Sequence, residues 1–155
     1  DWIAFSPNAE SILTCSRELR LWDAHSGELR WSHRHYEADP RNAIYSPDGQ
    51  MIATAIGNRI VALIDPTSGE IIGELQSDKG RGTTLAFASD SRTLAVSTHK
   101  SNIITLWDIQ TRQELCVLET NLKYLSSLAF SPDAKRLVAA GQAFEDRQSP
   151  YGTGQ

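Results

Sequence analysis

The chain consists of short apolar runs separated by polar turns, and no segment shows sustained helical periodicity. The runs are rich in Ile, Val, Leu and Thr and are bounded by Pro, Asp, Ser and Gly, which is typical of β-strands joined by tight turns. The pattern predicts strands at 2–5, 12–15, 19–22, 29–32, 43–45, 51–55, 60–64, 71–75, 84–87, 93–97, 103–107, 114–118, 126–130 and 136–140. The predicted fold class is therefore all-β.

Two sequence phrases recur along the chain in step with each other. One is LRLWDAHSGEL at 19–29, which returns as VALIDPTSGEI at 61–71 and as ITLWDIQTRQEL at 104–115. The other is IAFSPNAE from residue 3, which returns as AIYSPDGQ, LAFASDSR and LAFSPDAK. Its aromatic residues are Phe5, Tyr45, Phe87 and Phe130, at intervals of 40, 42 and 43 residues. Periods of about 40–45 residues with several strands in each unit are typical of propeller blades.

The Ser-Pro-Asp turns followed by Leu-Trp-Asp strands resemble the WD-repeat (WD40-type) family of β-propellers. The resemblance extends from residue 2 to about residue 141, and Ile64 stands where the second repeat would carry its Trp. The residues that match the structural motif of the family are Trp22, Asp23, Asp65, Trp107 and Asp108. The resemblance implies four-stranded antiparallel blades, with the first strand of each blade nearest the propeller axis. In this arrangement Tyr45, Phe87 and Phe130 are expected to be largely buried near the blade interfaces.

The predicted strands divide residues 1–141 into blades at about 2–33, 43–76 and 84–119 and a half-blade at 126–140. Closed propellers have typically four to eight blades, so about three and a half blades are expected to form an incomplete ring. Such an arc should expose apolar blade faces at its two ends, so the isolated chain is expected to be unstable or to self-associate. The tail at 142–155 lacks a further strand motif and is predicted to be irregular.

Composition is consistent with a soluble β domain, with 40% hydrophobic and 22% charged residues. The apolar stretches are far shorter than the ~20 residues of a membrane helix. The net charge of -4 predicts no bulk attraction to nucleic acid or to an anionic membrane. Cys15 and Cys116 are expected to be two buried, reduced thiols, which favours a reducing, cytoplasmic location. Because the chain opens inside its first strand, we expect it to be a segment of a longer protein, with any targeting signal upstream.

A search for catalytic chemistry gives no residue set that combines a nucleophile, a base and an orienting group. His33 and His35 alternate at one strand end and could share a metal. A solvated loop is favoured for them, because no Cys or carboxylate stands at the usual zinc spacing. The repeated aspartates lack the clustered oxygen ligands that calcium prefers and are expected to cap turns. The predictions are no catalytic residue, no metal and no cofactor, so the chain is not expected to be an enzyme.

A second resemblance leads to an alternative function. WDAHSGELRW at 22–31 is similar to the blade motif of quinoprotein dehydrogenases, in which a Trp after the Ser-Gly turn docks neighbouring blades. That family would imply an enzyme with a quinone cofactor and a metal. The place of Trp31 holds Gly73 and Cys116 in the next two repeats, so the docking Trp does not recur. The quinoprotein interpretation therefore ranks second.

The WD-repeat resemblance implies a non-catalytic platform for protein–protein interaction. Acidic residues dominate the turns that follow the first and third strands of the repeats, and basic and aromatic residues gather in the loops expected at the opposite face. The predicted partner-binding residues are Arg17, His35, Tyr36, Arg59, Lys79, Arg81, Lys100, Lys123 and Tyr124. Tyr and Arg are enriched at interface hot spots, although solvated turns would show the same composition. The expected partners are an acidic protein segment and the remaining blades of the same or another chain, without nucleic acid or membrane.

Overall fold

A computed structural model of the protein describes residues 2–34, 42–56, 59–79, 82–98 and 102–143. Within these ranges every regular element is a strand, and the strands form three four-stranded sheets and one two-stranded sheet. Neighbouring strands in each sheet are consecutive in the sequence and pair antiparallel. No helix capable of crossing a membrane occurs in this part of the chain. The predicted all-β class, with blades that do not close into a ring, is confirmed.

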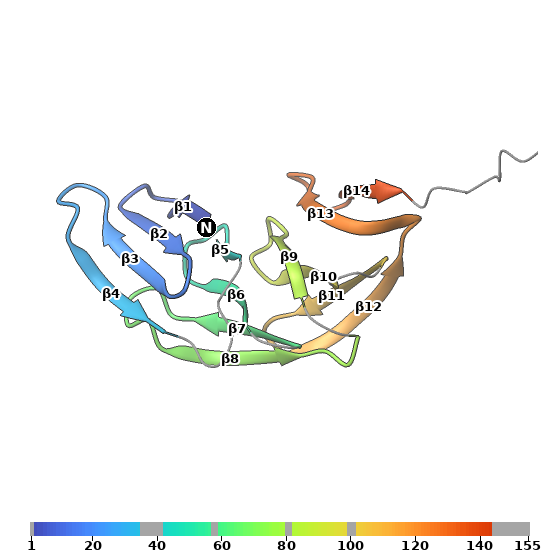
Figure 1. The fold of residues 1–155 in the computed structure, drawn as a ribbon, viewed down its shortest axis with the longest axis horizontal. Helices are drawn as coiled ribbons and strands as arrows, with labels where there is room; N and C mark the ends of the chain where they lie inside the picture. The colour runs from blue at the N-terminus through green and yellow to red at the C-terminus, as the bar shows by residue number, and fades with distance from the viewer. Residues whose placement is uncertain (1, 35–41, 57–58, 80–81, 99–101, 144–155) are drawn as a thin grey trace, which may run out of the picture.

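The blades follow one another around an arc (Figure 1). The first contains β1 (Trp2–Phe5), β2 (Ser11–Cys15), β3 (Leu19–Asp23) and β4 (Leu29–His33). The second contains β5 (Ala43–Tyr45), β6 (Ile52–Ile56), β7 (Ile60–Ile64) and β8 (Ile71–Gln76). The third contains β9 (Gly82–Phe87), β10 (Thr93–Thr98), β11 (Ile103–Asp108) and β12 (Gln113–Glu119), and β13 (Leu122–Phe130) with β14 (Leu137–Ala143) completes the series. The strands β4, β8 and β12 run along the outside of the arc.

The hydrophobic core lies in three seams between successive blades rather than inside one blade. The first seam includes Leu13, Leu19, Leu21, Ile52 and Ile64, and the second includes Leu63, Leu75, Leu94, Val96 and Trp107. The third includes Ala95, Ile104, Leu125 and Leu128. Every residue of β6 is buried, because the second blade is covered on both faces. Burial of a Leu or Ile side chain contributes about 1.5–3 kcal/mol, so the seams are the main stabilising contacts between blades.

The repeated aromatic residues lie at the margins of these seams. We expected Tyr45, Phe87 and Phe130 to be largely buried, but each is half-buried and packs against the edge of one seam. They belong to the first strands, which are edge strands of their sheets, so neighbouring strands shield each ring from one side only. Phe5 is 62% exposed, since no described blade precedes it.

A bulge recurs where the outer strand of each complete blade begins. The register between the third and fourth strands shifts by one residue in all three blades, which leaves Arg30, Ile72 and Leu115 as the extra residues. The positions after the bulge are therefore equivalent, and Trp31, Gly73 and Cys116 stand opposite Leu21, Leu63 and Leu106. Because a bulge increases local twist, its repetition shapes the outer rim of the arc.

The last hairpin is longer than the sequence pattern predicts. β13 starts at Leu122 and β14 ends at Ala143, two residues inside the segment that we expected to be irregular. A Cβ at Gly141 would clash with the backbone oxygen of Tyr124, so glycine is required for this close pairing. Gly141 therefore lies inside a strand, next to a register shift. The rest of the predicted tail, 144–155, lies outside the described residues.

The two cysteines differ in their environments. Cys15 is buried in the first seam, and burial raises the pKa of its thiol to about 11. Cys116 is exposed, so the prediction of two buried thiols is wrong for this residue. It lies on β12, every residue of which is exposed, because the sheet that follows has only two described strands. Neither cysteine is in a disulfide.

The exposed side chains of β1 predict self-association of the 155-residue chain. Ile3 is 66% and Phe5 62% exposed, and both lie on the uncovered face of the first blade. We expect sedimentation to show concentration-dependent association. Replacing both residues by Ser should weaken it by about tenfold or more, because burial of one such side chain contributes about 1.5–3 kcal/mol. The control is Leu29→Ser, which removes a 48% exposed side chain from an outer strand. A monodisperse monomer at all concentrations would contradict the prediction.

Candidate interaction surface and the turns that frame it

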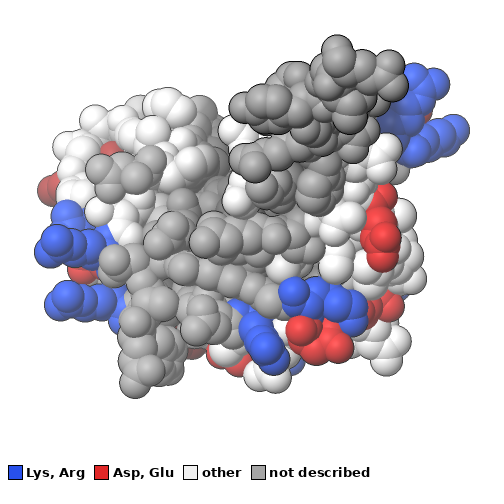
Figure 2. Space-filling view, turned by 45° about the vertical axis from the view of Figure 1, so that its right-hand side comes forward, with Lys and Arg blue, Asp and Glu red and all other residues white. Residues whose placement is uncertain are grey.

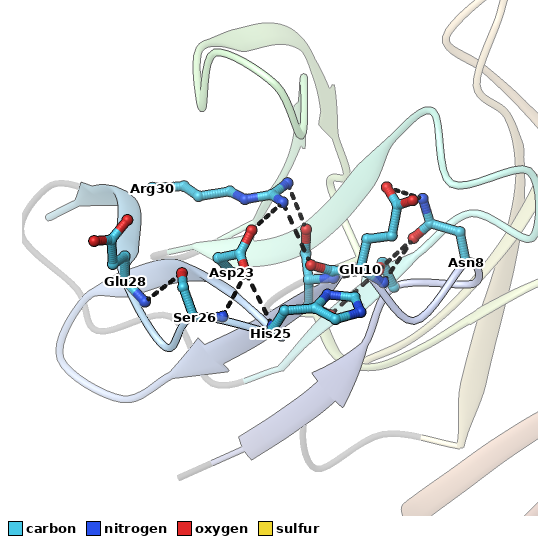
Figure 3. A network of polar contacts seen from close by, with 9 residues as sticks. Asn8, Glu10, Asp23, His25, Ser26, Glu28 and Arg30 are labelled. Carbon is cyan, nitrogen blue, oxygen red and sulfur yellow. Dashed lines mark hydrogen bonds and ion pairs between the residues drawn. The ribbon is translucent and has the colours of Figure 1, made fainter.

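The turn after the third strand of each complete blade is capped by an aspartate. One carboxylate oxygen of Asp23 accepts the backbone N–H groups of His25 and Ser26, at 2.9 and 2.8 Å (Figure 3). Asp65 accepts the equivalent bonds from Thr67 and Ser68, and Asp108 accepts them from Gln110 and Thr111. The fourth residue after each aspartate adopts a left-handed conformation, with φ of 74° at Gly27, 75° at Gly69 and 60° at Arg112. The aspartates therefore cap turns, as the sequence indicated.

Two of these aspartates also bind an arginine. The Arg92 guanidinium donates to Asp108 Oδ2 from Nε at 2.9 Å and from Nη2 at 2.6 Å, and the bond lowers the pKa of this carboxyl to about 2. Arg30 Nη2 lies 2.6 Å from Asp23 Oδ2 and holds the pKa of Asp23 well below its usual range. Figure 3 shows Arg30 reaching across to the turn that contains Glu10. The carboxylates of Asp23 and Asp108 therefore hold their turns in place through both backbone hydrogen bonds and ion pairs.

The Ser-Pro-Asp phrase forms a second kind of capped turn, after the first strand. The serine hydroxyl accepts a backbone N–H five residues later and donates to the side chain two residues later. These contacts link Ser6 with Ser11 and Asn8, Ser46 with Met51 and Asp48, and Ser131 with Arg136 and Asp133, at 2.5–3.0 Å. In the third blade Ala88 replaces the serine, and Asp90 instead accepts bonds from Arg92 and Thr93. The repeated phrase is therefore explained by turn structure.

Four of the predicted partner-binding residues have described side chains. Arg17 and Arg59 are exposed, Lys79 is half-buried and Tyr124 is 38% exposed on β13. His35, Tyr36, Arg81 and Lys100 lie outside the described residues, as does the side chain of Lys123. That these residues form one binding face stays a prediction.

Basic and acidic side chains meet at the outer rim. Lys79 contacts the Asp78 carboxylate and lies 3.9 Å from Glu114 Oε2, so the positive charge of this predicted binding residue is partly balanced. Figure 2 likewise shows Lys and Arg side chains next to Asp and Glu at several places. The free basic charge is therefore smaller than the loop sequences suggest. The charge of Arg59 also acts on Asp78, although the side chains of Arg17 and Arg59 are both exposed.

Between described residues, three hydrogen bonds join neighbouring blades. The Trp31 indole N–H donates to the Pro66 carbonyl at 2.8 Å across the first seam. Across the second seam, Arg112 Nη2 donates to the Ile72 carbonyl at 2.7 Å and the Asp48 N–H donates to Ser91 Oγ at 3.0 Å. The sequence analysis did not identify Arg112 as a residue that contacts the neighbouring blade. The feature that could have identified it is the arginine itself, because the first two repeats have Gly27 and Gly69 at this position.

An open groove of about 570 Å³ lies along the outer side of the second seam. Gly73 and Trp107 line it together with Ile72, Glu74 and Arg112.

Among the residues that the structure describes, no cluster of three or more His, Cys, Asp or Glu side chains could hold a metal. His33, one member of the suggested metal pair, packs edge-on against Trp31 with ring centroids 5.6 Å apart.

Antiparallel four-stranded blades in an arc, with aspartate-capped outer turns, define the chain as part of a β-propeller. It is 27% identical over 131 residues to WD repeat-containing protein SL1-17 of Schistosoma mansoni, covering 84% of this chain and 42% of that protein. It is 28% identical to the WD repeat-containing protein 26 homolog of Arabidopsis thaliana, covering 88% and 23%. Mouse apoptotic protease-activating factor 1 is also 28% identical, covering 88% and 12%.

The chain spans less than half of the length of each of these relatives. No family model matches the chain. The repeated agreement with WD repeat-containing proteins over most of the chain, together with the blade architecture, confirms the resemblance to the WD-repeat family.

The Arg92–Asp108 pair predicts a specific loss of stability in acid. The folded-state pKa of Asp108 is about 2 against an ordinary value of 3.8, so the stabilisation is complete above about pH 5 and is lost as the pH falls from about 4 to about 2. Asp108→Asn keeps an oxygen for the turn N–H groups but removes the charge. We expect this variant to be less stable at neutral pH and to show a flatter decline in acid, measured by denaturant unfolding at a series of pH values.

The matched control is Asp65→Asn. Asp65 accepts the same two turn bonds, and no arginine pairs with it among the described residues. The neutral-pH loss should therefore be smaller than for Asp108→Asn. Equal losses would show that the turn bonds, and not the ion pair, dominate.

Proposed function

We propose that the chain is a non-catalytic platform for protein–protein interaction and a segment of a larger WD-repeat propeller protein. The observation that carries this proposal is the use of the repeated carboxylates. Asp23, Asp65 and Asp108 each accept two backbone N–H groups of their own turn, and Asp23 and Asp108 also bind an arginine. Carboxylates held in this way stabilise the turns of the fold. Relatives with WD repeats support the same function by analogy.

We propose an acidic protein segment as the partner of the loop surface that contains Arg17 and Arg59. Both side chains are exposed, and exposed arginines recognise carboxylates with two parallel bonds.

Further blades, from the same or another chain, are proposed to cover the exposed side chains Ile3 and Phe5 of β1 and Val138 of β14. The net charge of -4 supports partners other than nucleic acid or membrane, and a cytoplasmic location stays part of the proposal.

Charge reversal at the loop surface tests the acidic partner. Arg17→Glu with Arg59→Glu should slow association with a labelled peptide of alternating Glu and Ser and should reduce its salt dependence, because rim charges act mainly on the association rate. Fluorescence anisotropy at low and high salt measures both effects. The control is Lys135→Glu with Arg136→Glu, which changes the charge equally at two exposed residues of the last turn. A larger effect of the control pair would place the binding surface on the other side.

A quinoprotein enzyme is the second candidate, and one observation favours it. Trp31 docks the first blade on the second through its bond to Pro66, as a quinoprotein docking Trp would. The equivalent places hold Gly73 and Cys116, which cannot make this contact. If the chain bound pyrroloquinoline quinone with calcium, both ligands together would raise its Tm by mass action. We expect no change in Tm by calorimetry, and a saturable increase would favour the enzyme.

A further inference from the structure

One position of the first strand is buried at every internal seam and exposed in the first blade. Ile3 of β1 corresponds to Ala43, Leu85 and Leu128, at the repeat intervals of 40, 42 and 43 residues. Those three residues are buried in the first, second and third seams, whereas Ile3 is exposed. Phe5, two residues further along the same strand, is exposed as well. The first blade therefore presents one half of a seam, and we call Ile3 and Phe5 the head face.

The last hairpin presents the opposite half of a seam. Val138 of β14 corresponds to Leu13, Ala53 and Ala95 of the three preceding second strands, all of which are fully buried. Val138 itself is 66% exposed, because it lies on the face of the hairpin that is turned away from the third seam. Ala140 is exposed on the same face, since alternate residues of a strand point to the same side. We call Val138 and Ala140 the tail face.

Every internal seam brings these two repeat positions into one cluster. The first-strand residue always belongs to the later blade and the second-strand residue to the earlier one. The pairs are Ala43 with Leu13, Leu85 with Ala53, and Leu128 with Ala95. A contact between Ile3 of one molecule and Val138 of another would repeat this pairing in the same order. The head and tail faces are therefore complementary halves of the seam that the fold already uses.

The third strand of the first blade is polar on the side of the head face. Arg20 of β3 stands where the second and third blades have Ala62 and Thr105, both of which are buried. Its side chain is 45% exposed and contacts the Glu18 carboxylate. Its guanidinium carbon lies 5.9 Å from the centroid of the Trp22 ring. Covering such an ion pair would cost hydration, so this part of the first blade is suited to solvent.

A two-stranded partner fits this division between an apolar first strand and a polar third strand. The last described sheet contains only β13 and β14, which are the first and second strands of their repeat. In the second seam, Trp107 of the third strand is covered by Leu63 and Leu75, which belong to the third and fourth strands of the preceding blade. A four-stranded blade would therefore bury Arg20, whereas the hairpin would cover the head face and leave Arg20 in solvent.

We propose that the head face binds the tail face of a second copy of this chain, and that two copies pair through two such head-to-tail seams. The first blade and the last hairpin lie at the two ends of the arc, so both faces are open to a second molecule (Figure 1). Two copies double the three four-stranded sheets and the single hairpin, which gives eight sheets in all. Closed propellers have about four to eight blades. The inference rests on the proposed platform function and names the other chain that supplies its further blades.

Complementation between two variants tests the order of the faces. The head variant carries Ile3→Ser with Phe5→Ser, and the tail variant carries Val138→Glu. In sedimentation each variant alone should associate about tenfold or more weakly than the wild-type chain, because each loses apolar contact in both seams. An equimolar mixture should associate again, since the intact tail of one variant meets the intact head of the other. The mixture should stay weaker than the wild type, because only one of the two seams forms.

Other modes of association give different results in the same experiment. If two head faces met, the tail variant alone would associate like the wild type, and if two tail faces met, the head variant would. Either result would overturn the head-to-tail order, as would a mixture that associates no better than its components. The wild-type chain should stop at the dimer, because head-to-tail contacts end when the ring closes. Assemblies that keep growing with concentration would overturn the closed pair.

Disulfide trapping provides a second measurement, which decides even if a complementation variant does not fold. With the exposed Cys116 replaced by Cys116→Ser, the variants Ile3→Cys and Val138→Cys are purified separately and mixed with a mild oxidant. The mixture should give a disulfide-linked dimer, and each variant alone should give little. A linked dimer from Ile3→Cys alone, or no linked dimer from the mixture, would overturn the proposal.

Arg20→Gln is the control for the extent of the contact. It removes the ion pair outside the proposed seam and should leave association unchanged. A strong loss would show that the third strand is covered too, which would overturn the hairpin as the partner. The acidic peptide that tests Arg17 and Arg59 is measured separately. Loss of that binding would argue against the loop surface, and loss of association would argue against the paired faces, so the two failures are distinguishable.

Discussion

Each blade of this chain is a thin sheet with two apolar faces, and the burial of those faces against neighbouring blades is the constraint on which the rest of the structure depends. The second blade shows it most clearly, because β6 is buried along its whole length between two seams. A sheet of this kind has no independent core. Its stability comes from the side chains that it shares with the blades on either side.

Matching two sheets across a seam requires each strand to keep its register, because a slip of one residue would turn the apolar side chains to the wrong face. The capped turns meet this requirement. Asp108 holds the turn between β11 and β12, and Ser46 holds the turn between β5 and β6. The repeated bulge then shifts the register of the outer strand by one residue in each complete blade, which brings Trp31 and Gly73 to equivalent places. Turn chemistry and seam packing are thus parts of one arrangement.

Much of this arrangement could be predicted from the sequence, because strands with alternating apolar residues and turns with Asp, Pro and Gly are local features. The bounds of β5 and β7, for example, agree with the prediction. Features that depend on a neighbour could not be predicted in the same way. Cys116 is exposed because of the sheet that follows it, and β14 continues through Gly141 because the backbone of Tyr124 comes close. The contact between Gly73 and Arg112 joins residues of different repeats, and only their shared departure from the pattern indicated it.

The contrast between the two thiols makes the first seam open to direct observation. Cys116 is accessible on the outer strand, whereas Cys15 is buried and its raised pKa disfavours the reactive thiolate. An alkylating reagent should therefore label Cys116 at once and Cys15 only when the first two blades separate. With Cys116 already blocked, the labelling rate of Cys15 would report how often the first seam opens in the native protein. Local separation of the first two blades could then be measured without unfolding the whole chain.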